Sequence, residues 1–404
     1  MTITTGTRHD QHPHRIEGNL VSETAPLLNQ TLTSMEAIDP IVSIEVALLR
    51  IPLANPVKIA IAEIPFREYN VVTVTTREGV TGTGYARGGT IVDLALRDYL
   101  APHLIGKASD GIDEIWDFAY QLTIQVGRRG AVLRAMSAID IALWDIRARR
   151  SEQPLWRLLG GTRKHVPCYA SGGYYGEGRG LTELAREVET YMARGFTAVK
   201  VKVGGADVAT DRERVEIVRS VAGDSATIMV DANTGYDGKR DTALELARYL
   251  RDSGVRFFEE PFGPDRITDL AWLRSMEVLP IASGEQESTR WGFEQLLGAS
   301  AVDVAQPDVT VVGGVSEWLR VAEMTQARGI PLAPHYFPEV HSQLAGAVPS
   351  TEWVEYFTRD IDIVNFDDVL AQPLAPVNGF IELSEQPGVG INLDPLAVAK
   401  FRVR

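Results

Sequence analysis

Residues 198–203 read Ala-Val-Lys-Val-Lys-Val, an apolar, β-branched run with lysines at two alternate positions. Similar runs recur after it, and each ends in a residue with a chemically useful side chain. The endings are Lys202, Asp231, Glu259, Glu285, Asp308, His335 and Glu355, and their numbers differ by 29, 28, 26, 23, 27 and 20. A (β/α)8 barrel spends about 30 residues on each βα unit and has its active site at the carboxyl ends of its strands. The spacing therefore predicts a barrel at whose mouth these side chains converge.

The segments around this run predict the rest of the domain organisation. Residues 1–40 are polar and contain three histidines, so we expect a solvated N-terminal tail. Residues 41–163 change from strand-like alternation to a helical period, which indicates an α+β capping domain. Residues 164–356 would form the barrel, and the turn-rich residues 357–404 would pack back on the capping domain. The predicted fold class is α/β, a modified TIM barrel of the (β/α)7β type whose N-terminal α+β capping domain is completed by the C-terminal segment.

Two parts of the predicted capping domain have features of their own. Between its first two strands lies an apolar segment, Leu53 to Arg67, which we interpret as a loop that either packs in place or closes over a ligand. A helix around residues 135–146 is apolar nearly all round, so it is expected to be buried. The two acids in that helix, Asp140 and Asp145, are then expected to be structural hydrogen-bond acceptors.

Composition and charge exclude several classes of protein. A chain of 404 residues is long enough for a barrel with a smaller companion domain. The net charge of −14 argues against a nucleic-acid surface, which needs clustered Lys and Arg. No stretch approaches the ~20 apolar residues of a membrane span, and the first residues lack the apolar core of a signal peptide. The single cysteine, Cys168, excludes an internal disulfide and fits a reducing compartment, so we expect a cytoplasmic protein.

Three successive strand endings are acids, Asp231, Glu259 and Glu285. Three carboxylates with no Cys or His among them suit a hard divalent cation that prefers oxygen ligands, above all Mg²⁺. Negative charges brought this close repel one another unless a cation neutralises them. A single acid would be interpreted as a helix cap or an ion-pair partner. Three in succession at barrel spacing predict a metal site that holds one Mg²⁺ per subunit, with Mn²⁺ as a substitute.

Lys200 and Lys202 are two residues apart on a predicted strand, so they point to the same side. The intervening valines, Val199, Val201 and Val203, would lie on the other side and pack against helices. The lysines then project into the barrel, where a neighbouring ammonium and the metal would both lower a lysine pKa toward that of a useful base. Acids and lysines at one mouth suggest a small carboxylate substrate bound to the metal, with a base beside its α-carbon.

Asp308 and His335 end strands on the far side of the predicted mouth. A carboxylate bonded to an imidazole fixes the imidazole's tautomer and stabilises its cation, which gives a general acid/base pair. Removal of a proton next to a carboxylate leaves an enediolate dianion that a metal and hydrogen-bond donors must stabilise. A protonated Glu355 would donate a hydrogen bond to the oxygen opposite the metal.

In their joint order and spacing, these motifs resemble the enolase superfamily and, within it, the mandelate racemase subgroup. The likeness covers the chain from about Ile41 to its end. The motifs that carry it are Lys200-Val201-Lys202, Asp231-Ala232-Asn233, Glu259-Glu260-Pro261, Gly284-Glu285, Asp308 followed by Gly313-Gly314, His335, Glu355, the helix from Ser137 to Asp145, and the closing Pro387-Gly388-Val389-Gly390-Ile391. Any one of them is a weak signal, and only the whole set is specific.

The resemblance implies a role for each site residue. The three acids would hold Mg²⁺. Lys202 would be the base on one face of the α-carbon, with its pKa tuned by Lys200. His335, paired with Asp308, would act on the other face. Glu355 would hydrogen-bond the substrate carboxylate. The family also implies a homo-oligomer.

The resemblance is less informative about the rest of the substrate. Asn233 would be an accessory polar contact, the segment from Leu53 to Arg67 would cap the site, and Tyr85 to Gly89 would form a second capping loop. Four residues are candidate contacts for substrate hydroxyls or a distal carboxylate: Arg67, Tyr69, Tyr174 and Tyr175. Three isoleucines of the first capping segment would instead suit an apolar substrate: Ile59, Ile61 and Ile64.

The pair of Asp308 and His335 separates subgroups of the family. Muconate cycloisomerases and dipeptide epimerases of the superfamily have a lysine on the sixth strand, where this chain has Asp308. Val311 replaces a lysine sometimes found between the Asp and the Gly-Gly, and we expect it to face the helices. The resemblance favours an acid sugar dehydratase that makes a 2-keto-3-deoxy acid. A racemase or epimerase of a 2-hydroxy acid and a non-catalytic protein that binds a metal or sugar acid remain as alternatives.

Overall fold

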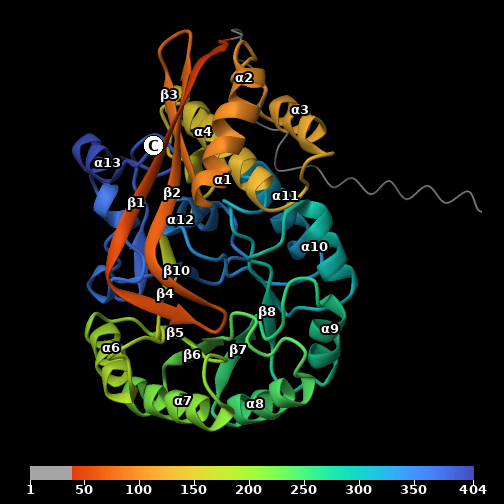
Figure 1. Ribbon diagram of the computed structural model, residues 1–404, viewed down its shortest axis with the longest axis vertical. Helices are drawn as coiled ribbons and strands as arrows, with labels where there is room; N and C mark the ends of the chain where they lie inside the picture. Colours follow the sequence, from red (N-terminus) through yellow and green to blue (C-terminus); the bar gives the residue numbers. More distant parts are fainter. Residues whose placement is uncertain (1–38) are drawn as a thin grey trace, which may run out of the picture. The chain divides into compact units, whose positions relative to one another are not determined.

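The computed structural model describes residues 39–404, so nearly all of the tail expected over residues 1–40 lies outside the described residues. An antiparallel sheet with helices comes first, and a ring of parallel strands alternating with helices follows it (Figure 1). This is the α/β architecture predicted from the sequence, a barrel preceded by an α+β domain. Within the described part of the chain, no helix combines the length and the apolar character that a membrane crossing requires.

The first sheet is a three-stranded meander with the strands in chain order, namely β1 (Ile41–Ile59), β2 (Ala62–Thr76) and β3 (Thr81–Arg87). The interpretation of residues 53–67 as a loop was wrong, because these residues continue β1 and β2 as a paired ribbon. Val57 lies opposite Ile64, after a register shift that begins at Pro52. The β-branched residues of the ribbon favour pairing, and proline, which cannot donate a ladder hydrogen bond, accounts for the interruption.

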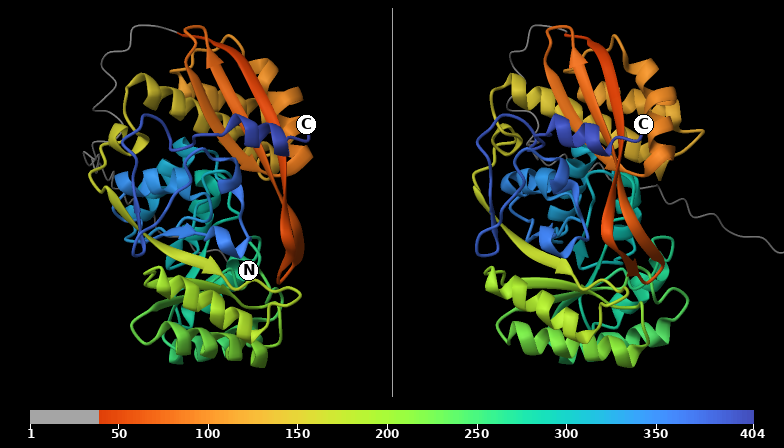
Figure 2. Two further views of the ribbon diagram at one scale, coloured as in Figure 1. Left: turned by 90° about the vertical axis from the view of Figure 1, so that its left-hand side faces the viewer. Right: turned by 60° about the vertical axis from the view of Figure 1, so that its left-hand side comes forward.

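Backbone hydrogen bonds attach the tip of this ribbon to the barrel. The N–H of Lys58 donates to the carbonyl of Tyr175 at 2.7 Å, and the N–H of Tyr175 donates back at 3.0 Å. Tyr175 follows the first barrel strand. Figure 2 shows the long ribbon of β1 and β2 extending from the sheet down to the barrel strands.

The helical part of the capping domain comprises α1 (Gly89–Leu94), a π-helical turn (Ala95–Leu100), α2 (Ala101–Leu104), α3 (Ile112–Thr123), α4 (Ala131–Arg150) and α5 (Leu155–Leu158). Helix α4 is buried along most of its length, as predicted, and packs on β2 and β3. Gly82 and Gly84 of β3 permit this approach, since a Cβ at either position would collide with a backbone carbonyl of α4.

Helix α4 also carries the two predicted structural acceptors. Asp140 accepts hydrogen bonds from the N–H and the hydroxyl of Ser316, at 3.0 and 2.6 Å. Asp145 accepts from the N–H groups of Thr83 and Val389, both at 2.9 Å. The prediction for both acids is confirmed. Together they tie α4 to β3, to the barrel and to the C-terminal segment.

The barrel alternates strands and helices as the sequence rhythm predicts. Its elements are β4 (His165–Gly172), α6 (Leu181–Ala193), β5 (Ala198–Lys202), α7 (Val208–Ala222), β6 (Thr227–Asp231), α8 (Arg240–Asp252), β7 (Val255–Glu259), α9 (Ile267–Ser275), β8 (Ile281–Ser283), α10 (Thr289–Gly298), β9 (Val304–Ala305), α11 (Val315–Gln326), α12 (Pro338–Ala347) and β10 (Val354–Tyr356). The strands are parallel, in the order β10-β4-β5-β6-β7-β8-β9. Leu332 closes the ring, because it bridges Ala305 on one side and Thr351 on the other.

The C-terminal segment contacts both domains. Phe380–Glu382 (β11) pairs antiparallel with the start of β4, so this strand lies against the barrel. The sequence had predicted that it would pack on the capping domain, and for this strand the prediction was wrong. Gly388 instead bridges to Pro154 of the capping domain. After α13 (Pro395–Phe401), the carbonyl of Arg404 accepts a hydrogen bond from β1.

Candidate active site

Strand geometry sets the direction of the site residues. Successive side chains of a strand point to opposite faces, so every second residue faces the barrel interior. The interior holds one small layer of buried apolar side chains, contributed by Tyr169, Ala198, Met229, Phe257, Ala282, Val304 and Ala333. On β5, β6 and β7, the residue two positions after the layer residue points the same way, and these residues are Lys200, Asp231 and Glu259. The polar side chains thus form the next layer, at the carboxyl ends of the strands.

Asp231, Glu259 and Glu285 form a buried cluster of acids. One oxygen from each carboxylate lies within 4.8 Å of the corresponding oxygens of the other two. Glu285 follows β8 through Gly284, whose φ is +128°. A Cβ at Gly284 would collide with the ring of Phe293, so the turn that brings Glu285 to the cluster requires glycine.

Each lysine of β5 is buried against one of these acids. Nζ of Lys200 donates to both carboxylate oxygens of Glu259 at 2.8 Å, and Nζ of Lys202 pairs with Asp231. Burial opposes the charged form, but the carboxylates outweigh it and raise the pKa of Lys200 and of Lys202 above the ordinary value. Before a cation neutralises these acids, the direction is opposite to the predicted lowering, because Lys200 faces Glu259 of β7 and Lys202 faces Asp231 of β6.

The donor set fits a divalent cation. Burial and the nearby Asp231 carboxylate raise the pKa of Glu259 above its ordinary value, against the lowering effect of Lys200, as expected for acids crowded together away from water. Oε2 of Glu285 is buried and has no hydrogen-bond partner among the described residues. Its ion-pair contact with Nε2 of His335, at 3.5 Å, is not a hydrogen bond, and a buried carboxylate oxygen without a hydrogen bond is costly. A cation bound where the three carboxylates meet would pair with that oxygen and offset the repulsion, so the cluster is a candidate metal site.

Asp308 and His335 lie together as the sequence predicts. Nδ1 of His335 is 2.8 Å from Oδ2 of Asp308, while the other carboxylate oxygen accepts from the N–H and hydroxyl of Thr310. Because the carboxylate accepts, Nδ1 carries the proton and Nε2 is left to face the site, 3.5 Å from Glu285. Burial lowers the pKa of His335, but Glu285 and Asp308 outweigh it and hold that pKa above the ordinary value.

His341 was not singled out from the sequence, yet it supports this pair. Its Nε2 accepts a hydrogen bond from the N–H of Val309 at 3.0 Å, and its Nδ1 donates to the carbonyl of Tyr336 at 2.7 Å. Val309 follows Asp308, and Tyr336 follows His335. One neutral imidazole therefore joins the two segments that present the acid/base pair.

Glu355 is buried beneath the site. Its carboxylate is 2.8 Å from Nζ of Lys200 and accepts a hydrogen bond from the N–H of Tyr336 at 2.7 Å. Burial raises the pKa of Glu355, but Lys200, His335 and Lys202 lower it more, so the net shift is well below the ordinary value. The expectation of a protonated Glu355 that donates a hydrogen bond was wrong, because three cationic groups face it.

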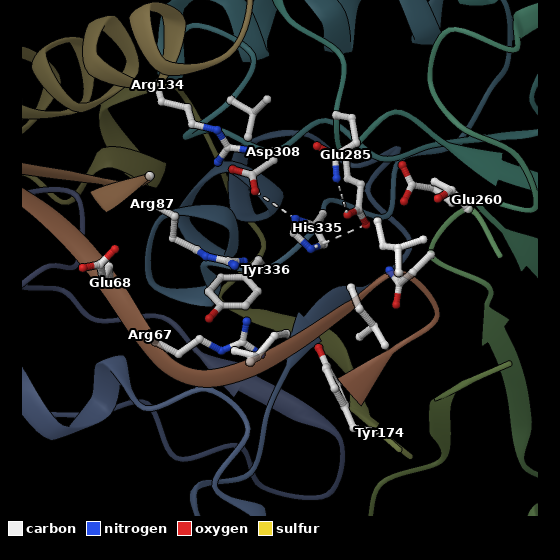
Figure 3. A pocket seen from close by; sticks show the side chains of 18 of the residues that line it. Arg67, Glu68, Arg87, Arg134, Tyr174, Glu260, Glu285, Asp308, His335 and Tyr336 are labelled. Atoms are coloured by element: carbon white, nitrogen blue, oxygen red, sulfur yellow. Dashed lines mark hydrogen bonds and ion pairs between the residues drawn. The ribbon is translucent and has the colours of Figure 1, made fainter. Parts of the chain in front are cut away.

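A cavity of about 440 Å³ opens over these groups (Figure 3). Lys202, Glu285, Asp308 and His335 line its floor, whereas Asp231, Glu259, Lys200 and Glu355 lie just beneath the surface. Other lining residues come from the tip of the β1–β2 ribbon, namely Ile59, Ile61, Ile64 and Phe66. The ribbon thus covers the mouth of the barrel.

The structure separates the predicted substrate contacts into two groups. Arg67, Tyr174 and Asn233 line the cavity. Tyr69 and Tyr175 do not, because their hydroxyls bond within the protein, Tyr69 to Tyr336 at 3.2 Å and Tyr175 to Asp211 at 2.8 Å.

Val311 was expected to face the helices, and this was wrong. It lines the cavity, because a backbone turn after Asp308, in which the N–H groups of Val311 and Val312 both donate to the Asp308 carbonyl, carries it inward.

Sequence reasoning assigned no role to four charged residues of the cavity, Glu68, Arg87, Arg134 and Glu260. They come from β2, from the end of β3, from α4 and from the residue after β7. The one available signal was weak, since Arg87 lies inside the expected second capping loop, Tyr85 to Gly89. That loop does reach the site, where Gly88 and Gly89 also line the cavity.

Comparisons with known proteins agree with this architecture. Residues 42–160 match the N-terminal domain of the mandelate racemase/muconate lactonizing enzyme family, and residues 183–397 match the enolase C-terminal domain-like family. The chain is 33% identical to an arabinonate dehydratase from Saccharolobus solfataricus over 82% of this chain and 90% of the relative. It is 30% identical to the L-talarate/galactarate dehydratase of Salmonella typhimurium LT2, whose crystal structure with Mg and L-lyxarohydroxamate superposes with a TM-score of 0.85 over 92% of this chain and 95% of that one.

A third similar protein is a racemase from Streptomyces coelicolor A3(2), solved with bound magnesium. It is 29% identical with a TM-score of 0.83, over 90% of this chain and all of that one (100%). Both domain models match in chain order, and the acid cluster, the two lysines and the Asp–His pair lie at the carboxyl ends of the barrel strands. The chain therefore belongs to the mandelate racemase/muconate lactonizing enzyme group of the enolase superfamily.

Proposed function

We propose that this chain is a Mg²⁺-dependent dehydratase that converts an acid sugar, an aldonate or aldarate, to a 2-keto-3-deoxy acid. The observation that carries the proposal is one cavity lined by Lys202 and His335, next to three carboxylates able to hold a cation. The dehydratases at 33 and 30% identity support the reaction and the substrate class. The magnesium bound in two similar crystal structures supports the choice of metal.

The proposed chemistry begins at the α-carbon of the substrate. A cation bound by the three carboxylates would place positive charge beside the substrate carboxylate and lower the energy of the dianion left when the α-proton departs. Lys202 or His335 takes that proton. Against the effect of burial, nearby carboxylates raise the pKa of both groups, and a cation that neutralised the acid cluster would lower these pKa values toward that of a base. The bond between the β-carbon and its hydroxyl then breaks, and His335 gives a proton to the hydroxyl, which leaves as water. The resulting enol tautomerises to the 2-keto acid.

The buried groups beneath the cavity would position the reacting ones. Asp308 keeps the proton of His335 on Nδ1, so that Nε2 faces the substrate. Lys200 is held between Glu259 and Glu355, and it fixes both carboxylates. We therefore assign Lys200 and Glu355 a positioning role. Asn233, Arg67 and Tyr174 remain proposed substrate contacts on the strength of their place in the cavity.

A turnover screen tests this function. The protein is incubated with Mg²⁺ and a library of aldonic and aldaric acids, and the 2-keto product is measured. We expect product from at least one acid, and none after chelation of the metal. Lys202→Ala and His335→Asn should abolish it, while His165→Asn, an exposed site at the opposite end of β4, is the matched control. Turnover that survives both substitutions and the chelator would refute the mechanism.

Racemisation of a 2-hydroxy acid is the second candidate function. The apolar ribbon tip over the cavity and the similar racemase with bound magnesium favour it. The two reactions separate cleanly, because a racemase interconverts enantiomers of a mandelate-like acid and makes no 2-keto product. A protein that only binds the metal or sugar acid would do neither and would exchange no α-proton with D₂O.

We also propose that the chain assembles as a homo-oligomer. Apolar side chains exposed on the capping domain support this, including Ile91 and Val126, which are 66 and 61% exposed. Light scattering of the purified protein measures the mass directly. A mass of one chain across the working concentration range would contradict the proposal.

A further inference from the structure

Three arginines of the capping domain converge on the cavity, Arg67 from β2, Arg87 from the end of β3 and Arg134 from α4. In the view of Figure 3 their side chains extend from one side toward the middle of the cavity, where His335 lies. Glu285 and Glu260 lie on the opposite side in the same view. The side of the cavity away from Glu260 thus carries three arginines and two acids, Glu68 and Asp308.

The protein itself satisfies these guanidinium groups only in part. Arg67 is 3% exposed, and its Nε donates to the carbonyl of Ile363 at 2.8 Å, but its buried Nη2 has no hydrogen-bond partner among the described residues. Arg87 lies over the ring of Tyr336, 4.9 Å from the ring centre. Over residues 39–404, the side chains of Arg87 and Arg134 make no hydrogen bond or ion pair with a carboxylate.

Acids near these arginines are already occupied. Glu68 lines the cavity, yet it accepts hydrogen bonds from Nε and Nη2 of Arg50 at 3.0 and 2.7 Å. Asp308 is bonded to His335 and to its own turn. Burial lowers the pKa of Arg134, and the charge of Arg87 lowers it further, against the opposing effect of Asp308 and Glu285. Like charges that repel one another at a partly buried site are relieved by an anion.

We propose that Arg67, Arg87 and Arg134 bind the second carboxylate of a dicarboxylic sugar acid, at the end of the substrate that lies away from the metal site. Guanidinium groups suit this task because they pair with a carboxylate through two parallel N–H···O bonds. A monocarboxylic acid sugar would present an uncharged hydroxymethyl group there and leave the arginines unneutralised. The inference rests on the proposed function and narrows its substrate class from acid sugars in general to aldarates.

Paired substrates test the inference. Each C5 or C6 aldarate is assayed with Mg²⁺ beside the aldonate of the same configuration. We expect the aldarate to be preferred in kcat/KM. Arg87→Met and Arg134→Met should each lower kcat/KM for the aldarate roughly 10- to 100-fold, mainly through KM, and reduce the aldarate-to-aldonate ratio. Arg87→Lys should retain part of the preference, because it keeps the charge and loses the two-point geometry.

Arg186→Met is the matched control, since Arg186 is an exposed arginine on the outer helix α6. It should leave the ratio unchanged. Turnover of aldonates with aldarates inert, or an unchanged ratio in both arginine variants, overturns the inference and leaves the proposed function standing. Absence of 2-keto product from every acid overturns both. If Arg134→Met does not fold, Arg87→Met at the half-buried end of β3 decides the outcome.

Discussion

The buried imidazole of His341 predicts a measurable loss of stability in mild acid. The side chain is fully buried, and burial lowers its pKa from 6.5 to about 4. A lowered pKa means that the folded protein resists protonation while the unfolded chain does not. The contribution of His341 to stability is therefore complete above pH 6.5 and is lost as the pH falls from about 6.5 to about 4.

The magnitude follows from the two pKa values. At pH 5.5, one unit below the ordinary histidine pKa, protonation stabilises the unfolded chain by about 1.4 kcal/mol and the folded protein almost not at all. Below the folded pKa the loss approaches about 3 kcal/mol. Protonation of Nε2 would also remove the acceptor for the N–H of Val309 and so loosen the segment that presents Asp308.

Urea unfolding followed by tryptophan fluorescence at pH 8 and pH 5.5 measures the effect. Other groups titrate in this range, so the informative quantity is the difference between the wild type and His341→Gln, whose amide can still donate and accept. Between pH 8 and pH 5.5, the free energy of unfolding should fall by about 1.4 kcal/mol more in the wild type than in His341→Gln. His103→Gln, at an exposed position of α2, should behave as the wild type does. Parallel losses in the wild type and His341→Gln would refute the reasoning.

Three further predictions concern packing, the buried ion pairs and the metal site. Gly314→Ala should lower the free energy of unfolding, measured in urea, by about 2–4 kcal/mol, because φ is +92° and the new Cβ would collide with Asp140. Gly106→Ala, at φ +84° with open space around it, should cost only about 1 kcal/mol, and equal losses would contradict the steric account. Lys200→Met should cost about 3–5 kcal/mol in metal-free buffer, since two buried carboxylates lose their cation, and a loss below about 1 kcal/mol would contradict this. Glu285→Gln should weaken Mg²⁺ binding at least about tenfold by calorimetry, and unchanged affinity would exclude Glu285 as a ligand.

The barrel and its acid cluster were predictable because they depend on local regularities. A strand has a period of two, and parallel barrel strands share one carboxyl edge. The spacing of Asp231, Glu259 and Glu285 in the sequence was therefore enough to predict that they meet. The Asp308–His335 contact follows from the same two rules.

Features that depend on contacts between distant segments were not predictable in this way. Arg134 belongs to a helix of the capping domain, and nothing in its own neighbourhood indicates that its side chain enters a barrel cavity. Likewise, the raised pKa of Lys202 depends on the register that sets it beside Asp231. Residues 53–67 were interpreted as an apolar loop between two strands, whereas strand pairing resumes beyond the prolines at 52 and 56.

The central claim is that one divalent cation binds where the three carboxylates meet, next to Lys202 and His335. Crystals grown with Mn²⁺ in place of Mg²⁺ test it most directly, through the anomalous scattering of the metal. We predict one strong anomalous peak per chain, within about 2.0–2.3 Å of oxygens of Asp231, Glu259 and Glu285. A peak at another place, or no peak at a saturating Mn²⁺ concentration, would contradict the account.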